Sequence, residues 1–472
     1  MARVLFLNFN SIWGPHFDTD LEIMLNLKNE GNEVYSLSCG NSFKHCCISN
    51  QSHDKKYCKR CYKTLQKGLD LIHLPKENRL EMSKSYFLPE ISFNNINDLK
   101  NYTIDGANIG LGVVSSLMMI TRDYNFNSND YKELIDCYLN VAYTVYRSID
   151  ELQKIYKFDE IYMFNGRFGE YYPAIEYCNQ NKIGYSLHDR GADMYKYAVV
   201  KNDLIHRFAR WKEEIELFWH NNSNNEYKEK IARKWFNDRR GGVDQNWVSF
   251  TKNQKENALP TNFDKSKDNI AIFNSSFDEY AVFDDWQNPI EKNENILIEN
   301  ILKHYIDDGS KHFYLRVHPN LKNVVTSQMR EIDDLKAKNY KNFTIIYPDE
   351  VIDSYALMNA CKKTVVSSST VGVETTYWGN VSIGTGKAMY DSFDCVYKAN
   401  NYDELYSLID SDLNPKPKEN TYKYGYWAAE YGIPFKYFEP NGLFHGKFLG
   451  VDLRKKPIWV KIRLAIQKLF KK

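Results

Sequence analysis

The sequence predicts an α/β protein made of two doubly wound domains that face one another across a cleft. Two observations support this fold class. The chain opens with an apolar strand, a helix and a second strand within residues 3–38, which is how a parallel sheet covered by helices begins. A second alternation of strands and helices starts at Asn269, after a polar stretch with Pro260 in its middle. A chain of 472 residues is long enough for two such domains, each with its own core.

Each expected element of the first half is a short apolar run or an amphipathic or apolar helical segment. The strands are expected at 3–8, 33–38, 69–74, 160–164 and 183–188, and the helices at 20–30, 57–68, 109–120, 131–155, 170–181 and within 203–238. The first strand is not followed by G-x-G-x-x-G, so the dinucleotide fingerprint is absent.

The second half repeats the same pattern. Its strands are expected at 270–273, 313–315, 343–346, 364–367 and 381–383, and its helices at 294–307, 326–337, 352–361, 371–378 and 402–409. We place the domains as follows: an acceptor-binding domain at 1–252, a linker at 253–268, a donor-binding domain at 269–425, an extension at 426–452 and a basic helix at 453–472.

Composition narrows the class of protein. Hydrophobic residues at 43% and charged residues at 26% are ordinary for a globular protein, and a net charge of +1 argues against a nucleic-acid partner. We find no run of 18 apolar residues, so we expect no membrane span. The N-terminus enters a strand directly and lacks the layout of a signal peptide, which predicts a cytoplasmic protein.

Polar side chains follow three strands of the second half. Asn274 and Ser275 follow the first strand, and Arg316 and His318 follow the second. The run Ser367–Thr370, which contains Ser368, Ser369 and Thr370, lies between a strand and a helix. Hydroxyls, backbone N–H groups and two cations at the carboxyl ends of strands predict a phosphate site. The plainer alternatives are a histidine at a strand end and a serine that only caps a helix.

The first half offers two carboxylates for general base catalysis. Asp189 ends a strand in His188-Asp189-Arg190-Gly191 and would take the proton of an acceptor hydroxyl. The plainer interpretation is an aspartate in a turn. Glu170, which follows Asn165-Gly166-Arg167, is the rival base. Arg167 and Arg190 would hold a carboxylate or phosphate of the donor or acceptor.

Three segments carry a family resemblance: His318-Pro319, Asp353–Ala360 and Ser368–Gly379. With them the chain resembles bacterial capsule and lipopolysaccharide glycosyltransferases of the GT-B architecture, in which two Rossmann-like domains face a cleft. The same pair of motifs occurs in sialyltransferases and Kdo transferases, which use CMP-sugars. The resemblance implies that His318 and the hydroxyl residues contact the donor phosphate, and that Glu374 holds the ribose hydroxyls.

We therefore expect a metal-independent glycosyltransferase that extends a capsule or lipopolysaccharide glycan, with a CMP-Kdo or sialic-acid-like donor favoured. In Asp189-Arg190-Gly191 an arginine stands where the related transferases carry a second carboxylate, which leaves the donor nucleotide open. The alternatives are a sugar-nucleotide 2-epimerase or a CDP-polyol phosphotransferase of the same fold, and a non-catalytic scaffold for polysaccharide assembly.

Two further segments suggest partners. Cys39, Cys46, Cys58 and Cys61, with a C-x-x-C pair, have the spacing of a structural zinc site, and the alternative is a group of reduced thiols. Residues 453–472 contain eight Lys/Arg and no Asp/Glu, with isoleucines along one helical face. This pattern predicts a helix on an anionic membrane surface, and hence an enzyme on the inner face of the plasma membrane with a lipid-linked acceptor. A solvated tail or a partner-binding helix is the alternative.

Overall fold

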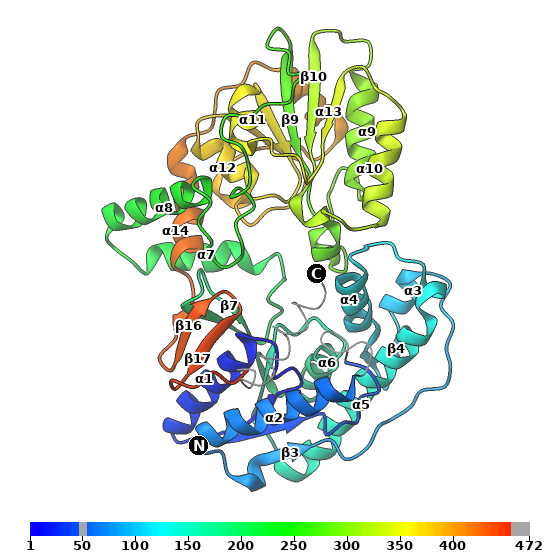
Figure 1. The fold of residues 1–472 in the computed structure, drawn as a ribbon, viewed down its shortest axis with the longest axis vertical. Helices are drawn as coiled ribbons and strands as arrows, with labels where there is room; N and C mark the ends of the chain where they lie inside the picture. Colours follow the sequence, from blue (N-terminus) through cyan, green and yellow to red (C-terminus); the bar gives the residue numbers. More distant parts are fainter. Residues whose placement is uncertain (47–53, 455–472) are drawn as a thin grey trace, which may run out of the picture.

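The computed structural model describes residues 1–46 and 54–454, and Figure 1 shows two α/β lobes, one above the other. In the described residues, the sheet of the N-terminal domain has the strand order β15-β8-β7-β6-β1-β2-β3, and that of the C-terminal domain has the order β11-β10-β9-β12-β13-β14. The second order starts from the middle strand and builds outward to each side in turn, which is the doubly wound Rossmann order. The predicted fold class, two Rossmann-like domains in the GT-B arrangement, is confirmed.

Alternate residues of the first strand face two different cores. Leu5 and Leu7 pack in the core that contains α4–α6, and Val4 and Phe6 pack in the core that contains α1 and α2. Helices therefore cover both faces of the sheet. The elements of this domain are β1 (Arg3–Leu7), α1 (His16–Asn29), β2 (Glu33–Ser38), α2 (Lys55–Leu71), β3 (Arg79–Glu81), α3 (Ile96–Lys100), β4 (Thr103–Ile104), β5 (Ala107–Asn108), α4 (Gly110–Thr121), α5 (Lys132–Tyr156), β6 (Glu160–Phe164), α6 (Tyr172–Asn181), β7 (Gly184–Arg190) and β8 (Lys196–Lys201).

The strand expected at 69–74 is wrong. Helix α2 continues to Leu71, because Leu65, Leu69 and Ile72 recur at helical spacing and are buried in the core shared with α1. The third strand is instead the short β3, ten residues later than expected. The strand β8 was not expected, and it pairs antiparallel with β7.

The C-terminal domain is built in the same way. Ile270 and Ile272 of β9 face α9, α10 and α13, whereas Ala271 and Phe273 face the core that includes α11. Its elements are β9 (Asp268–Phe273), α9 (Glu294–His304), β10 (Lys311–Arg316), α10 (Ser327–Ala337), β11 (Phe343–Ile346), α11 (Ser354–Ala360), β12 (Lys363–Val366), α12 (Val371–Tyr377), β13 (Val381–Gly384), β14 (Tyr397–Lys398) and α13 (Tyr402–Asp410).

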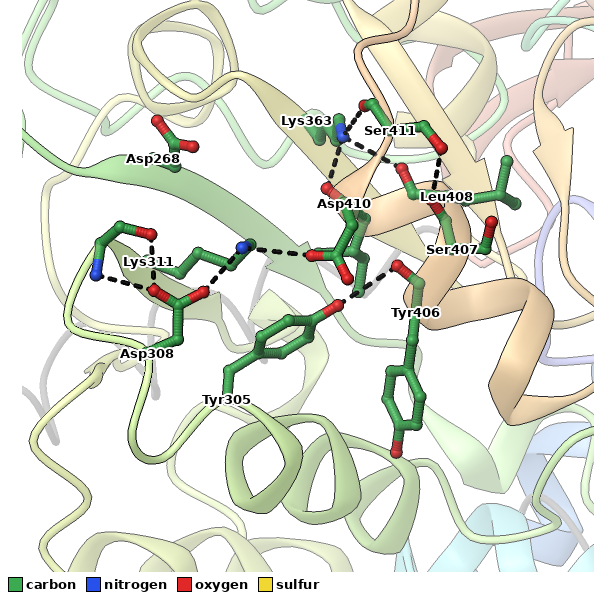
Figure 2. A network of polar contacts seen from close by, with 12 residues as sticks. Asp268, Tyr305, Asp308, Lys311, Lys363, Tyr406, Ser407, Leu408, Asp410 and Ser411 are labelled. Atoms are coloured by element: carbon green, nitrogen blue, oxygen red, sulfur yellow. Dashed lines mark hydrogen bonds and ion pairs between the residues drawn. The ribbon is translucent and has the colours of Figure 1, made fainter.

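Lysines tie α13 to the amino ends of the C-terminal strands (Figure 2). Lys363, the first residue of β12, donates from Nζ to the carbonyl oxygens of Leu408 (3.0 Å) and Ser411 (2.5 Å). Lys311 in β10 forms an ion pair of 3.1 Å with Asp410. The last carbonyls of a helix have no partner within the helix, so the Lys363 ammonium group caps the end of α13, and Lys311 adds an ion pair with a side chain of its last turn.

The chain crosses between the two domains twice. After β8 it forms α7 (Arg210–His220) and α8 (Asn225–Arg240), and after α13 it forms α14 (Tyr422–Glu430), which packs against α7 and α8 beside the junction of the two lobes (Figure 1). Helix α14 spans the boundary placed at residues 425/426 in the sequence.

The C-terminal extension returns to the N-terminal domain. Strand β15 (Ile433–Pro434) pairs with β8, and the hairpin β16 (Phe438–Gly442) and β17 (His445–Phe448) follows. The buried carboxylate of Glu22 in α1 accepts backbone N–H groups of Lys436, Tyr437 and Phe438 at 2.7–3.0 Å. No helix in the described part of the chain has the length and apolar character needed to cross a membrane.

Candidate functional site

A cavity of about 750 Å³ opens at the carboxyl ends of the C-terminal strands, and we call it the strand-end pocket. It lies where the strand order reverses, between β9 and β12, which is where doubly wound sheets bind their ligands. The C-terminal domain lines it with Asn274, Glu279, Tyr280, Arg316, His318, Asn320, Tyr355, Ser369, Thr370 and Glu374, and other segments add Arg122, Arg239, Asn246, Trp247 and Phe250.

His318 is held at the pocket wall in one orientation. Its backbone N–H donates to Asn274 Oδ1 (2.8 Å), and its Nδ1 accepts the N–H of Asn320 (3.2 Å). Nδ1 is therefore unprotonated and Nε2 carries the hydrogen. Burial, with Arg122 nearby, lowers the pKa of His318 to about 4. At neutral pH the imidazole of the ligand-free protein is neutral. The two cations expected from the sequence, Arg316 and His318, are therefore one cation and one neutral hydrogen-bond donor.

Two other residues of the pocket lining, Asn274 and Arg316, each carry a buried donor atom that has no partner among the described residues. The Asn274 side chain is 1% exposed, and its Nδ2 has no partner among the described residues. Arg316 donates from Nη1 and Nη2 to the carbonyl oxygens of Tyr347 (2.6 Å) and Glu350 (3.1 Å), whereas its Nε has no partner there. Buried donors normally have acceptors, so this wall is suited to a ligand that carries oxygen acceptors.

The serine run is divided between two cavities. Ser369 and Thr370 line the strand-end pocket, as expected for the start of α12. Ser368 donates its backbone N–H to Ser275 Oγ (3.3 Å), and both residues line a second cavity next to the pocket instead. The residues predicted to bind the donor are thus brought to one region, but Ser275 and Ser368 line the second cavity and not the strand-end pocket.

Glu374 is already engaged by protein groups. Its carboxylate is 3% exposed, and Oε1 accepts from Arg239 Nε (2.9 Å) and Thr370 Oγ1 (3.1 Å) while Oε2 accepts from the hydroxyl of Tyr355. A ribose would have to compete with these partners, so contact with ribose stays a prediction. Here Glu374 orients Arg239, which reaches the pocket from α8.

The predicted acceptor residues lie on the N-terminal side of the cleft. Asp189 Oδ2 accepts from Asn165 Nδ2 (2.6 Å), and Asp189 does not line the strand-end pocket. Arg190 lies over the ring of Trp247, a pocket residue, at 5.4 Å. Arg167 donates to the carbonyl oxygen of Glu279 (2.9 Å).

Glu170 lies away from the cleft surface. Its side chain is fully buried, and Oε1 accepts from Asn10 Nδ2 (3.1 Å). A carboxylate enclosed in this way has no access to an acceptor hydroxyl in the structure, which argues against its role as the rival base.

Glu279 is a pocket carboxylate that sequence reasoning missed. Its Oε1 accepts from Asn320 Nδ2 (2.6 Å), and the backbone N–H of the same Asn320 contacts His318. Burial, with Asp278 nearby, raises the pKa of Glu279. No local motif marks Phe277-Asp278-Glu279, since its position depends on the contact between two loops about forty residues apart.

Arg122 and Arg239 were also missed. Arg122 ends α4 in the left-handed region (φ 57°) and forms an ion pair with Asp278 across the cleft at 2.9 Å. Arg122 precedes the first of the strand ends, Asn274, by 152 residues and Arg239 precedes it by 35, and only the packing of the domains brings both arginines to the pocket.

The four cysteines line one small cavity of about 30 Å³ in the N-terminal domain. Within residues 1–46 and 54–454, no group of three or more His, Cys, Asp or Glu has an arrangement that could hold a metal ion. Burial raises the pKa of Cys39 to about 12 and raises the pKa values of Cys46 and Cys61. The described geometry fits reduced thiols, so it lends no support to the zinc expectation. The predicted basic helix lies outside the described residues except for Leu453 and Arg454.

No family model and no curated protein matches this sequence. Among solved structures, the chain is similar to the KpsC β-Kdo 2,4 transferase of Thermosulfurimonas dismutans, with 11% identity over 66% of this chain and 87% of that chain, at a TM-score of 0.37. It is also similar to the UDP-GlcNAc 2-epimerase of Methanocaldococcus jannaschii in complex with UDP-GlcNAc and UDP (13% identity, 90% and 98% covered, TM-score 0.28). The UDP-GlcNAc 2-epimerase of Neisseria meningitidis gives 11% identity over the whole of both chains, at a TM-score of 0.26. At such TM-scores these likenesses carry no weight for function, and the fold assignment depends on the sheet topology.

Proposed function

We propose that the protein is a glycosyltransferase that moves a sugar from a nucleotide-activated donor to a glycan acceptor. The observation that carries the proposal is a pair of buried donors, Asn274 Nδ2 and Arg316 Nε, that have no partner in the described part of the chain and belong to residues of the strand-end pocket, as His318 does. Phosphate oxygens would accept from these groups. Donors fixed in advance stabilise the negative charge that develops on a leaving phosphate.

The reaction needs a base that takes a proton from the acceptor. In the proposed step the acceptor oxygen bonds to the anomeric carbon as its proton passes to a carboxylate. The bond from the anomeric carbon to the phosphate oxygen breaks, and its electron pair leaves with the nucleotide. Glu279 is the carboxylate that the geometry favours, because it lines the pocket and is joined to His318 through Asn320. Asp189, the base expected from the sequence, is the competitor.

A CMP-linked Kdo or sialic-acid-like sugar is the donor that we favour, on the His-Pro and serine motifs, with a capsule or lipopolysaccharide glycan as acceptor. A 2-epimerase is the second candidate. It is favoured by two carboxyl groups of raised pKa, Glu279 and Glu294, which line two neighbouring cavities. Removal and return of a proton at a sugar carbon needs such an acid and base.

The test begins with the stabilisation of the protein by CMP, CDP, UDP and GDP in a thermal-shift assay. His318→Ala should abolish nucleotide-induced stabilisation and sugar transfer, because it removes the donor next to the proposed phosphate. His312→Ala, at the other end of the same strand, is the matched control and should bind nucleotide as the wild type does. A folded His318→Ala protein with normal transfer would overturn the proposal. Deuterium uptake by UDP-GlcNAc in D₂O without an acceptor would identify the epimerase instead.

A further inference from the structure

We propose that the second cavity is the subsite for a sugar ring. This inference rests on the proposed function and adds to it the place where the glycosyl group binds. The cavity, which we call the interdomain chamber, has a volume of about 340 Å³, within the usual range of small-molecule sites. Both domains line it, with Asn97 and Tyr124 on one side and Ser275, Tyr280, Trp286 and Glu294 on the other.

The chamber adjoins the strand-end pocket. Tyr280 lines both cavities, and consecutive residues divide between them at two places: Asn274 with Ser275, and Ser368 with Ser369. A ligand whose phosphate contacts Asn274 would therefore extend into the chamber at the place where the two linings meet. Two adjoining cavities are what one donor molecule requires for its nucleotide and its sugar, or what a donor and its acceptor require together.

The kinds of charged group differ between the two cavities. Arg122, Arg239 and Arg316 line the strand-end pocket together with the carboxyl groups of Glu279 and Glu374. In the chamber Lys100 is held by Asp284 at 2.7 Å, Lys292 also belongs to the lining, and burial raises the pKa of Glu294 to about 8, so this carboxyl is largely uncharged at neutral pH. The strand-end pocket therefore offers guanidinium groups to an anion, and the chamber offers an uncharged carboxyl group to the hydroxyls of a ligand.

The chamber wall combines an aromatic surface with polar groups. Tyr280 and Trp286 stack on one another with ring centroids 4.4 Å apart, and Trp286 is fixed by donating from Nε1 to the carbonyl oxygen of His206. Glu294 accepts the N–H of Ser275 through Oε2 (3.0 Å), which orients its carboxyl group. A sugar ring has an apolar face of C–H groups and an edge of hydroxyls, and a rigid aromatic wall with oriented polar groups matches both.

The experiment compares the binding of nucleotides and nucleotide sugars by chamber variants. Asn97→Trp places a bulky side chain at the chamber from an exposed position of α3, and Asp98→Trp is the matched control, one residue on and outside the lining. Glu294→Ala removes the oriented carboxyl group. The probes are UDP with UDP-GlcNAc and CMP with CMP-N-acetylneuraminate, measured by calorimetry.

We expect Asn97→Trp and Glu294→Ala to bind the free nucleotide within twofold of the wild type and to bind the sugar-linked form at least tenfold more weakly. Asp98→Trp should change neither affinity. If donor affinity is unchanged and the KM for the glycan acceptor rises tenfold, the ring in the chamber is that of the acceptor. Wild-type behaviour of both chamber variants on donor and acceptor would overturn this inference alone. A wild-type protein that binds neither these four probes nor CDP or GDP would overturn the proposed function with it.

Discussion

At the scale of single residues, the two candidate bases differ in their surroundings. Glu279 lines the strand-end pocket, and burial raises its pKa, which makes its carboxylate a stronger base than an ordinary glutamate. Asp189 lies outside that pocket and accepts hydrogen bonds from Asn165 and from the backbone N–H of Arg190. These bonds suit a carboxylate that holds the strand end in place.

Glu279→Gln should therefore lower kcat of transfer by at least a hundredfold, with the KM for the donor little changed. Asp189→Asn keeps the shape of the side chain and should lower kcat far less. The measurement is steady-state kinetics with a pH profile, whose acidic limb should disappear in Glu279→Gln. A larger loss of kcat in Asp189→Asn than in Glu279→Gln would return the role of base to Asp189.

Glu294 should make stability depend on pH. Burial raises its pKa to about 8, whereas the carboxyl group of an unfolded chain titrates near its model value of 4.5. Between these values the folded state holds more protons than the unfolded state, so this group's contribution to the free energy of unfolding falls as pH rises from about 4.5 to 8. Glu294→Gln cannot ionise, so its stability relative to the wild type should increase through that window. Urea unfolding at pH 5, 6.5 and 8 measures the difference, and parallel curves would show that Glu294 ionises normally.

At the scale of elements, the sequence predicts those that depend on a local pattern. The bounds of β6 and β11 agree with the expected 160–164 and 343–346, because each strand is a short apolar run between polar residues. Strands β3, β8 and β15 were missed. Their extent is set by pairing with a neighbouring strand, and β15 has only two residues, too few for any periodicity.

The same distinction applies to the site. The strand ends with Arg316, His318 and the serine run could be recognised because each motif is continuous in sequence. Arg239 and Glu279 could not, since they reach the pocket only through the packing of segments remote from those motifs. The element that brings Arg239 there, α8, was predicted as a helix but could not be placed against α12 from the sequence.

The end of α13 gives an element-scale prediction. Lys363→Met removes an ammonium group that donates to carbonyl oxygens at the end of this helix, and leaves those partly buried acceptors without this donor (Figure 2). The cost of such unsatisfied groups is about 1–3 kcal/mol. Lys362→Met, at the exposed neighbouring position, should change stability by less than about 0.5 kcal/mol. Urea denaturation measures both variants, and equal effects would contradict the role assigned to Lys363.

At the scale of the whole molecule, we propose that the basic C-terminal segment attaches the enzyme to an anionic membrane. Arg454 is part of the folded protein, because its Nη2 forms an ion pair with the buried Asp18 at 2.6 Å and its Nε donates to the carbonyl oxygen of Ile12. A deletion that tests the segment should therefore begin at residue 455 and leave Arg454 in place.

Deletion of 455–472 should release the protein from anionic liposomes in a sedimentation assay. Each basic residue near such a surface contributes about 1 kcal/mol, and the apolar residues of the segment add contacts that salt does not screen. We expect the melting temperature and transfer to a soluble acceptor to stay unchanged, because this deletion keeps Arg454 and its contacts with Asp18 and Ile12. Full-length protein that remains in the supernatant at low salt would contradict membrane attachment.

The return of the chain to its first domain determines how the protein can be divided. The core of the N-terminal domain includes Phe438, Phe448 and Leu453, and its sheet includes β15. In genetic terms the N-terminal domain is discontinuous, and the C-terminal domain is an insertion within it. A fragment that stops in the interdomain linker would lack part of its own core and expose the carboxylate of Glu22 without its backbone partners. The insertion, by contrast, should be excised together with α8 and α14 when nucleotide binding is to be studied apart from the acceptor, because Phe236 of α8 stacks on Tyr377 of α12, Arg239 of α8 contacts Glu374, and α14 packs on α8.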